Sequence, residues 1–208
     1  NSEEEFKKLI HKVEEVGEFA IDTETNSLNP HLAKLVGISI SFKIGEAYYV
    51  PLNHSKGKNL DEKNILKILK PLLEDKAIKK IGQNIKFDYI IFYHRGIEMK
   101  FLEDTMLMSY VLDAGKNKHN MDELSKIHLD HITISYKDLV GIGKKQITFD
   151  DVDIGEAKDY AAEDADVTYR LYKKFLNDIK EEKLVNIYES FEKPMIEILA
   201  KMEINGIK

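Results

Sequence analysis

Three short segments with the pattern of β-strands, close together near the N-terminus, constrain the fold of this chain most strongly. They cover residues 19–23, 35–42 and 47–50, and Gly45 lies in the turn between the last two. The first segment is almost continuously apolar, which is typical of a strand in the centre of a sheet. A short turn joins the other two, as in neighbouring antiparallel strands. The sequence therefore predicts a three-stranded antiparallel meander.

The rest of the chain alternates between helical and extended patterns. We predict helices at residues 3–16, 61–74, 84–95, 105–112, 121–127, 153–180 and 191–204, extended segments at 78–82 and 98–103, and irregular structure at 129–150. A meander followed by mixed helices and strands predicts an α/β domain with a mixed sheet and helices on its faces.

Composition excludes several classes of protein. The 208 residues include no cysteine, so disulfides, zinc–thiolate sites and thiol catalysis are excluded, and a reducing cytoplasm is expected. No apolar run approaches 18 residues, so no membrane-spanning helix or membrane partner is expected. The first residues do not resemble a signal peptide, and the absence of an initial Met suggests a piece of a longer chain. The net charge of −6 means that any nucleic-acid contact must be local or assisted by bound metal ions.

The first acidic cluster, Asp22 and Glu24, lies at the end of the segment 19–23. On a strand these two side chains point to the same face. Two carboxylates on one face repel each other unless a cation lies between them, as in a metal site. A solvated strand end explains this pair about equally well when it is considered alone.

The second cluster is GQNIKFD, in which Asp88 follows Asn84 by four residues. Gly82 allows close backbone approach where an extended segment turns into a helix, and Asn84 can cap that helix. Gln83 has no obvious role in a core. Considered alone, Asp88 is better explained as an exposed residue on the rim of the helix.

The third cluster, Tyr160 and Asp164, lies one turn apart on the predicted helix 153–180. A phenol in this position can hydrogen-bond a water held by a metal on the carboxylate. The simpler explanation is a Tyr packed on the sheet and an Asp facing solvent. Glu163 and Asp166 are expected to be surface residues, and Asp104 to cap the helix 105–112. Together, the clusters offer four carboxylates and one phenol, which suits two magnesium ions and an attacking water.

The ordered set DTET, GQNIKFD and YAAEDADVT resembles the three exonuclease motifs of the 3′–5′ proofreading domain of bacterial DNA polymerase I. That domain belongs to the ribonuclease H-like, DnaQ-like superfamily, in the subgroup with four acids and a Tyr. The stretches LVGISISF, EDTMLMSYVL, HNMDEL and GKKQITF extend the resemblance over nearly the whole chain. It implies a ribonuclease H-like sheet in residues 1–187. It also implies that residues 188–208 correspond to the start of a polymerase domain in the same parent chain.

The resemblance also implies roles for individual residues. The metal ligands fall on Asp22, Glu24, Asp88 and Asp164, and the Tyr that orients the attacking water falls on Tyr160. The residues expected to contact the DNA strand are Leu28, Gln83, Asn84, Lys86, Lys118 and Tyr136. Leu28 matches a wedge against the terminal base, and Tyr136 matches an aromatic position near the penultimate nucleotide. Lys118 stands where the family often has Arg, so this phosphate contact loses its bidentate geometry.

The implied reaction is two-metal hydrolysis of the last phosphodiester at a single-stranded or frayed DNA 3′ end, releasing nucleoside 5′-monophosphates. Mg²⁺ or Mn²⁺ ions roughly 3.5–4 Å apart are expected, with Zn²⁺ as a substitute in crystals. Asp22 is expected to bridge them, Glu24 and Asp164 to complete the nucleophile side, and Asp88 to act mainly through waters. A monomer associated with the bacterial nucleoid is expected. The alternatives are a ribonuclease D-like RNA exonuclease and an inactive structural module.

Overall fold

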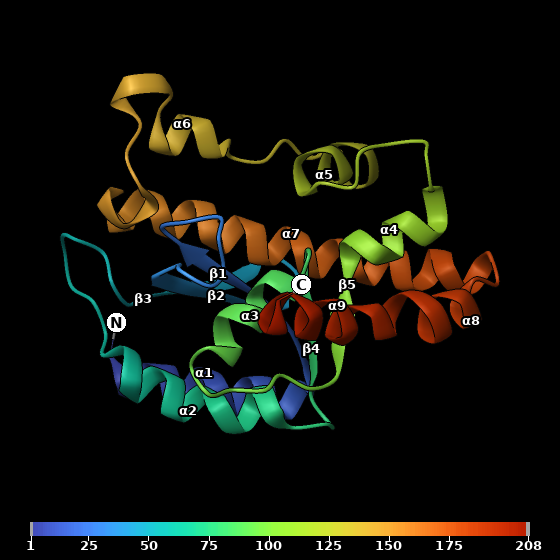
Figure 1. Cartoon of the computed structure of the whole chain (residues 1–208), viewed down its shortest axis with the longest axis horizontal. Helices are drawn as coiled ribbons and strands as arrows, with labels where there is room; N and C mark the ends of the chain where they lie inside the picture. The colour runs from blue at the N-terminus through green and yellow to red at the C-terminus, as the bar shows by residue number, and fades with distance from the viewer. Residues whose placement is uncertain (1, 207–208) are drawn as a thin grey trace.

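Strand β1 (Glu18–Thr25) lies at the centre of a five-stranded sheet in the computed structural model, which describes residues 2–206 (Figure 1). The strand order is β3-β2-β1-β4-β5, in which β1, β2 and β3 are antiparallel and β1, β4 and β5 are parallel. The predicted meander and the predicted mixed sheet are therefore both confirmed.

The remaining strands and the helices follow in regular order along the chain. The other strands are β2 (Leu35–Lys43), β3 (Glu46–Pro51), β4 (Lys79–Gly82) and β5 (Leu102–Asp104). The helices are α1 (Glu3–Val16), α2 (Glu62–Glu74), α3 (Lys86–Tyr93), α4 (Thr105–Asp113), α5 (Met121–Leu129), α6 (Tyr136–Val140), α7 (Ile154–Glu181), α8 (Val185–Ile187) and α9 (Lys193–Asn205).

Helices cover both faces of the sheet (Figure 1). Helices α1 and α2 lie on one face, and their apolar residues join those of β2, α3 and α9 in one core cluster. Helix α7 crosses the other face and shares a second cluster with residues of α4 and α5. Figure 1 shows α5 and α6 beyond α7, on the side away from the sheet. The sheet is thus buried between two helical layers, and α7 is the layer that faces the carboxyl-bearing side of β1.

Two predicted elements differ at their ends for backbone reasons. Helix α3 begins at Lys86 rather than at residue 84, because Asn84 has a left-handed φ of 61°. Asn84 therefore does not cap this helix, whose N-cap position is Ile85. The extended segment 98–103 is reduced to β5, because Phe101 has a φ of 55° immediately before it. Asp104 caps α4 as predicted, since its carboxylate accepts a hydrogen bond from the amide of Met106.

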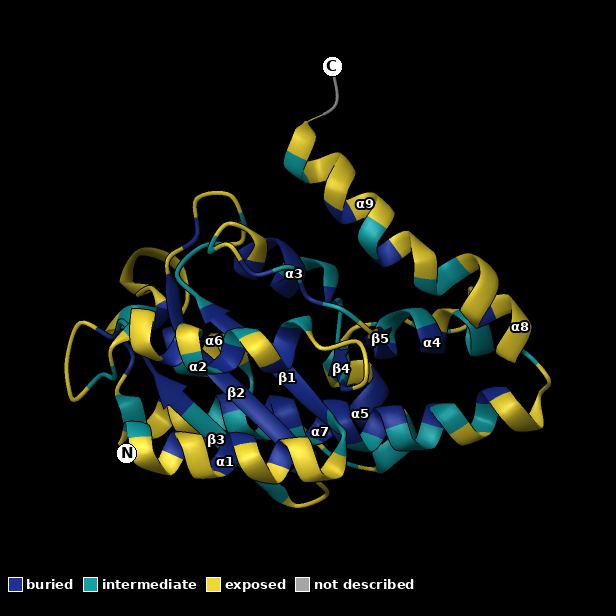
Figure 2. Ribbon diagram, turned by 90° about the horizontal axis from the view of Figure 1, so that it is seen from below, coloured by how far each residue is buried: buried dark blue, intermediate teal, exposed yellow. Residues whose placement is uncertain are grey.

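The region predicted as irregular, 129–150, contains α6 and two 3-10 turns, η1 (Gly143–Lys145) and η2 (Phe149–Asp151). After α8, a π-helical turn, η3 (Tyr188–Glu192), leads into α9. Most of α9 is exposed in Figure 2, but Ile196 and Ala200 are buried against the body of the domain. The predicted boundary after residue 187 stays a prediction, and Asn1, Ile207 and Lys208 lie outside the described residues.

In the part of the chain that the structure describes, no helix combines the length and apolar character needed to cross a membrane.

Candidate active site

Strand β1 carries two of the predicted carboxylates on one side of the sheet. Phe19 and Ile21 belong to the core on the α1 side, whereas Ala20 belongs to the core on the α7 side. The same two-residue period directs Asp22 and Glu24 toward α7. The amphipathic α7 is anchored by its buried residues on that face, so a carboxylate on its buried side can meet the strand pair.

Three carboxylates converge between β1 and α7. Oxygens of Asp22, Glu24 and Asp164 lie within 4.8 Å of one another. Glu24 and Asp164 are only 7% and 5% exposed, and Glu24 Oε1 has no hydrogen-bond partner among the described residues. A buried carboxylate oxygen without a donor costs free energy unless a cation neutralises it. The donor set, all oxygen and all anionic, fits a hard divalent cation such as Mg²⁺ or Mn²⁺.

Asp88 lies beside this group on the first turn of α3. It is 2% exposed, so the alternative of an exposed residue on a helix rim is wrong. Asp88 Oδ1 accepts hydrogen bonds from the amide and the hydroxyl of Thr23, at 2.9 and 2.6 Å. Thr23 lies between Asp22 and Glu24, so these bonds tie α3 directly to the strand that bears the other acids. The action of Asp88 on an ion through waters stays a prediction.

Tyr160 closes the site from the next turn of α7. It lies one turn before Asp164 on the same side of the helix, and its phenol interacts with the Asp164 carboxylate and lowers the pKa of that group. Its ring belongs to an aromatic cluster with Tyr136 and Phe149, whose centroids lie 6.0 and 6.1 Å away. Tyr136 and Phe149 stack with an interplanar angle of 6°. The cluster packs the Tyr160 ring in place and connects it to α6, which begins at Tyr136.

A cleft of about 750 Å³ opens above the carboxylates. Its lining includes the acids Asp22, Glu24 and Asp88, the predicted strand contacts Leu28, Gln83, Asn84 and Tyr136, and Tyr160. Leu28 is 95% exposed, so its side chain is free to meet a ligand. A smaller, mainly apolar pocket of about 350 Å³ lies between α1 and β3, away from the acids.

The two predicted strand-contact lysines lie outside the lining of this cleft. Lys118 is exposed and lines an adjoining pocket, which shares Gln83 and Asn84 with the cleft. Lys86 forms an ion pair with Glu203 of α9. Lys118 can therefore meet a strand that continues past Gln83, whereas Lys86 is held by a carboxylate of the C-terminal helix.

The profile of the 3′–5′ exonuclease family matches residues 1–180. The chain belongs to this family. The exonuclease domain is 43% identical to DNA polymerase I of Rhizobium leguminosarum over 92% of the chain, and 41% identical to that of Pseudomonas aeruginosa over 97%. It spans 21% and 23% of these two curated relatives, so it corresponds to about one fifth of their length.

Solved structures support the fold. NrnC of Brucella melitensis with bound Mg²⁺ matches with a TM-score of 0.70 at 23% identity, covering 91% of this chain and 86% of that one. Escherichia coli RNase D matches with a TM-score of 0.69 at 15% identity, covering 93% of this chain and 48% of that one. The ribonuclease H-like fold is therefore confirmed. The much higher identity to DNA polymerase I favours that relationship over the ribonuclease D-like alternative.

The acids of the exonuclease domain resist joint ionisation in the absence of metal. Burial raises the pKa of Asp22 to about 6. Burial, followed by the charges of Asp22, Asp164 and Asp88, raises the pKa of Glu24 well above its usual range. Burial and the charge of Asp22 also raise the pKa values of Asp88 and Asp164, against the hydrogen bonds from Thr23 and Tyr160. Divalent metals, which this family uses, would supply the missing positive charge.

Sequence patterns missed several residues that shape the site. Phe149, which is fully buried, supports Tyr136 and Tyr160, and Gln146 and Thr148 form part of the cleft wall. All three residues lie in the stretch GKKQITF, which was the sequence signal that could have identified them.

Gly37 leaves room for Tyr49, since a Cβ there would lie 2.1 Å from the Tyr49 hydroxyl.

The expectation that Glu163 and Asp166 are ordinary surface residues is wrong. Glu163 accepts a hydrogen bond from the amide of Ile134, and its carboxylate lies 2.8 Å from Nε2 of His131. Asp166 accepts a hydrogen bond from the amide of Gly45 at 2.6 Å. Both are partly buried because they anchor loops to α7, and the Glu163 contacts hold the segment that leads to Tyr136.

We expect Asp22→Asn to stabilise the metal-free exonuclease domain at pH 8. Folding raises the pKa of Asp22 from about 3.9 to about 6. The stability that comes from keeping this carboxyl neutral in the folded state is therefore fully present below pH 4. It is lost as the pH rises through about 6. The variant should therefore gain about 1–3 kcal/mol in free energy of unfolding at pH 8, and the gain should shrink toward pH 4. Urea unfolding of both proteins in EDTA across this range measures it. A gain that is equal at both pH values would contradict the assignment.

Proposed function

We propose that this domain removes nucleotides one at a time from single-stranded or frayed DNA 3′ ends by two-metal-ion hydrolysis. The products are nucleoside 5′-monophosphates, and the role is proofreading within a DNA polymerase I. The observation that carries the proposal is the convergence of Asp22, Glu24 and Asp164 within 4.8 Å, beside a cleft that Asp22 and Glu24 line. Membership of the 3′–5′ exonuclease family supports it.

Asp22, Glu24 and Asp164 would hold one divalent ion, and Asp22 together with Asp88 would hold the second. When bound, the ions supply Lewis-acid activation of the attacking water and stabilisation of the leaving 3′ oxygen. The chain's own contribution is to hold these carboxylates close together against their mutual repulsion, with Glu24, Asp88 and Asp164 buried and Asp22 partly buried. The bonds from Thr23 to Asp88 fix the relative position of the two groups of ligands.

Tyr160 would position the water as a hydrogen-bonding group rather than act as a base. Burial, and then the nearby charges of Asp164 and Glu24, raise the pKa of its phenol, so it stays protonated at neutral pH. The protonated phenol lies one turn from Asp164 on the same side of α7, beside the ligand it serves. Its second lone pair remains available to accept a hydrogen bond from a water.

The cleft suits a single strand that enters by its 3′ end. Leu28 and Tyr136 present apolar and aromatic surface on which bases can stack without sequence preference. Beyond Gln83 and Asn84, Lys118 would meet a phosphate of the incoming strand. Because a mismatched end frays more easily than a paired one, such a cleft selects mismatches without contacting base edges.

In the parent protein, we propose that residues 188–208 begin the polymerase domain, and that the whole acts as a monomer at the bacterial nucleoid in the cytoplasm. The second function with an observation behind it is RNA 3′-end trimming, because RNase D shares the fold.

The direct test uses matched DNA and RNA strands carrying a 5′ label, incubated with the domain and Mg²⁺. The proposal expects a ladder that shortens from the 3′ end of DNA, with the RNA degraded more slowly. Faster cleavage of RNA would favour the second function. Complete stability of both strands would contradict nuclease activity.

A further inference from the structure

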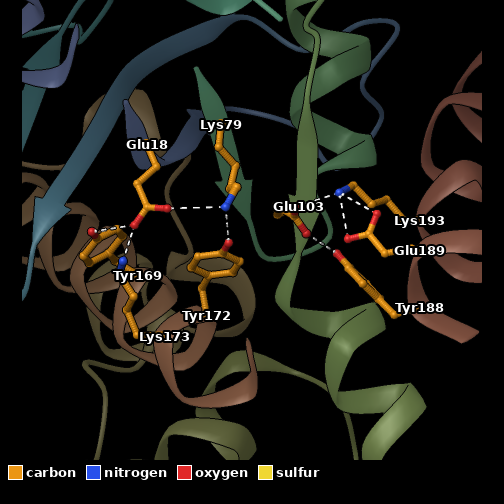
Figure 3. A network of polar contacts seen from close by, with 9 residues as sticks. All are labelled: Glu18, Lys79, Glu103, Tyr169, Tyr172, Lys173, Tyr188, Glu189 and Lys193. Atoms are coloured by element: carbon orange, nitrogen blue, oxygen red, sulfur yellow. Dashed lines mark hydrogen bonds and ion pairs between the residues drawn. The ribbon is translucent and has the colours of Figure 1, made fainter. Parts of the chain in front are cut away.

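Polar contacts join the C-terminal segment to Glu103 of β5, and Figure 3 shows Glu103 with its partners Tyr188 and Lys193. Tyr188, in the π-helical turn, is 2% exposed. Its hydroxyl donates to Glu103 Oε2 at 2.8 Å and accepts from the amide of Asp104 at 3.1 Å. Lys193 lies 2.7 Å from the other Glu103 oxygen, so the Glu103 charge is paired although the side chain is buried.

Asp104 extends this connection to the active-site turn, residues 82–85. Its Oδ1 accepts from the amide of Asn84 and its Oδ2 from the amide of Ile85, both at 3.0 Å. The hydroxyl of the next residue, Thr105, lies 3.1 Å from the Gly82 carbonyl oxygen and 2.5 Å from Gln83 Oε1, and its single hydrogen is shared between these two acceptors. Asp104 is 1% exposed, so water does not replace these bonds easily. The junction of β5 and α4 therefore contacts a polar group on each residue of the turn.

The active-site turn needs such support because its backbone is unfavourable by itself. Asn84 has a φ of 61°, a left-handed conformation that is uncommon for residues other than Gly and that Asn tolerates better than most. The turn also folds back so closely that a Cβ on Gly82 would lie 2.7 Å from the Ile85 Cβ. Gln83 and Asn84 line the cleft, and Asp88 follows on the first turn of α3. A shift of this turn would move both the strand-binding wall and a carboxylate of the site.

We propose that Asp104 is a positioning residue for the active-site turn, and that Tyr188 holds Asp104 in place through β5. The effect of this positioning on catalysis rests on the proposed nuclease function, but the positioning of the turn does not. The family match ends at residue 180, so Tyr188 lies outside the part of the chain that defines the family. Tyr188 and Asp104, which are 84 residues apart in sequence, thereby connect the C-terminal segment to the active-site turn.

The matched control is Tyr172, which lies in the second network of Figure 3. Tyr172 is fully buried, and its hydroxyl accepts from Lys79 Nζ at 2.6 Å. Lys79 pairs with Glu18, so this network joins β1, β4 and α7 rather than the active-site turn. Tyr172→Phe and Tyr188→Phe thus each remove one phenol oxygen from a buried side chain, and the two oxygens differ in what they hold.

Hydrogen–deuterium exchange on the metal-free domain tests the positioning without any assay of activity. Tyr188→Phe and Asp104→Asn should each speed exchange in peptides covering residues 82–87 by roughly 10-fold, because local opening there becomes easier. Tyr172→Phe should leave these peptides at the wild-type rate. Asp104→Asn supplies the second variant if Tyr188→Phe destabilises the whole domain. The Asn side chain has nearly the size of Asp, but its amide group places a donor against a backbone N–H of the turn. Wild-type exchange in both variants, or equal acceleration in Tyr172→Phe, would overturn the proposal.

Cleavage kinetics then test the consequence for the site. Tyr188→Phe should lower kcat on a single-stranded DNA roughly threefold, because the misplaced turn displaces Asp88. The variant should also need a higher Mn²⁺ concentration for half-maximal activity. A general loss of stability would not change this concentration when the assay runs well below the unfolding temperature. A normal kcat and a normal Mn²⁺ requirement beside faster exchange would contradict the link to catalysis. An absence of cleavage in the wild type would count against the proposed function and leave the exchange result to decide the positioning.

Discussion

Asp22→Ala and Asp164→Ala are each expected to reduce release of the terminal nucleotide by about 10³-fold or more, equivalent to about 4 kcal/mol of transition-state stabilisation. Each change removes one of three carboxylates whose oxygens lie within 4.8 Å. The site then cannot hold the divalent ion that the reaction needs. Single-turnover cleavage of a 5′-labelled single strand in saturating Mg²⁺ measures the loss.

Asp159→Ala is the matched control for these variants. Asp159 lies on the same helix, but its side chain is 66% exposed and pairs with Lys158. We expect wild-type cleavage from this variant. The metal-site assignment fails if Asp22→Ala and Asp164→Ala both retain wild-type rates while remaining folded by circular dichroism.

Tyr160→Phe is expected to lower the rate by about 10- to 100-fold, less than either loss of an Asp. The change removes only the hydroxyl that interacts with Asp164 and keeps the ring that packs against Tyr136 and Phe149. The ions would still bind, but the water would be less well oriented. The rate should be compared over pH 6–9, where the loss should stay constant because the phenol does not ionise there.

Tyr169→Phe controls for removing a buried phenol from the same helix. Its hydroxyl donates to Glu18 at the opposite end of β1, far from the carboxylate cluster. This variant should cleave normally. Wild-type activity in Tyr160→Phe would remove the water-orienting role, and a loss confined to high pH would instead indicate that the phenolate acts as a base.

The fold could be predicted from sequence where the residue pattern of one segment indicates which of its faces are buried. The apolar run before Asp22 indicates a central strand because both its faces are buried, and β1 is indeed the middle strand of the sheet. The ends of α3 and β5 were not predictable in this way. They depend on left-handed backbone at Asn84 and Phe101, residues whose side chains do not require that conformation.

The residues of the candidate site could be predicted from sequence, but the contacts that arrange them in space could not all be predicted. Asp22, Glu24 and Asp164 could be placed on one face of a strand and one face of a helix by their periods alone. Asp88 could not, because its burial depends on Thr23, a partner 65 residues away in sequence. The contact of Glu103 and Tyr188, separated by 85 residues, has no local signal for the same reason.

Lys86 illustrates the limit of transferring a role by motif. Its position in GQNIKFD predicts a contact with the DNA strand, but the side chain pairs with Glu203 on α9. The pairing comes from the packing of α3 against the C-terminal helix, which no local pattern in either segment encodes.

The central claim is that the acidic cluster holds a pair of divalent ions, and crystals of the domain soaked in Mn²⁺ test it most directly. We predict two anomalous difference peaks, about 3.5–4 Å apart, between Asp22, Glu24 and Asp164 on one side and Asp88 on the other. Asp22→Asn crystals soaked in the same way should lose at least one of the peaks. Wild-type crystals with no Mn²⁺ at these four carboxylates would contradict the account.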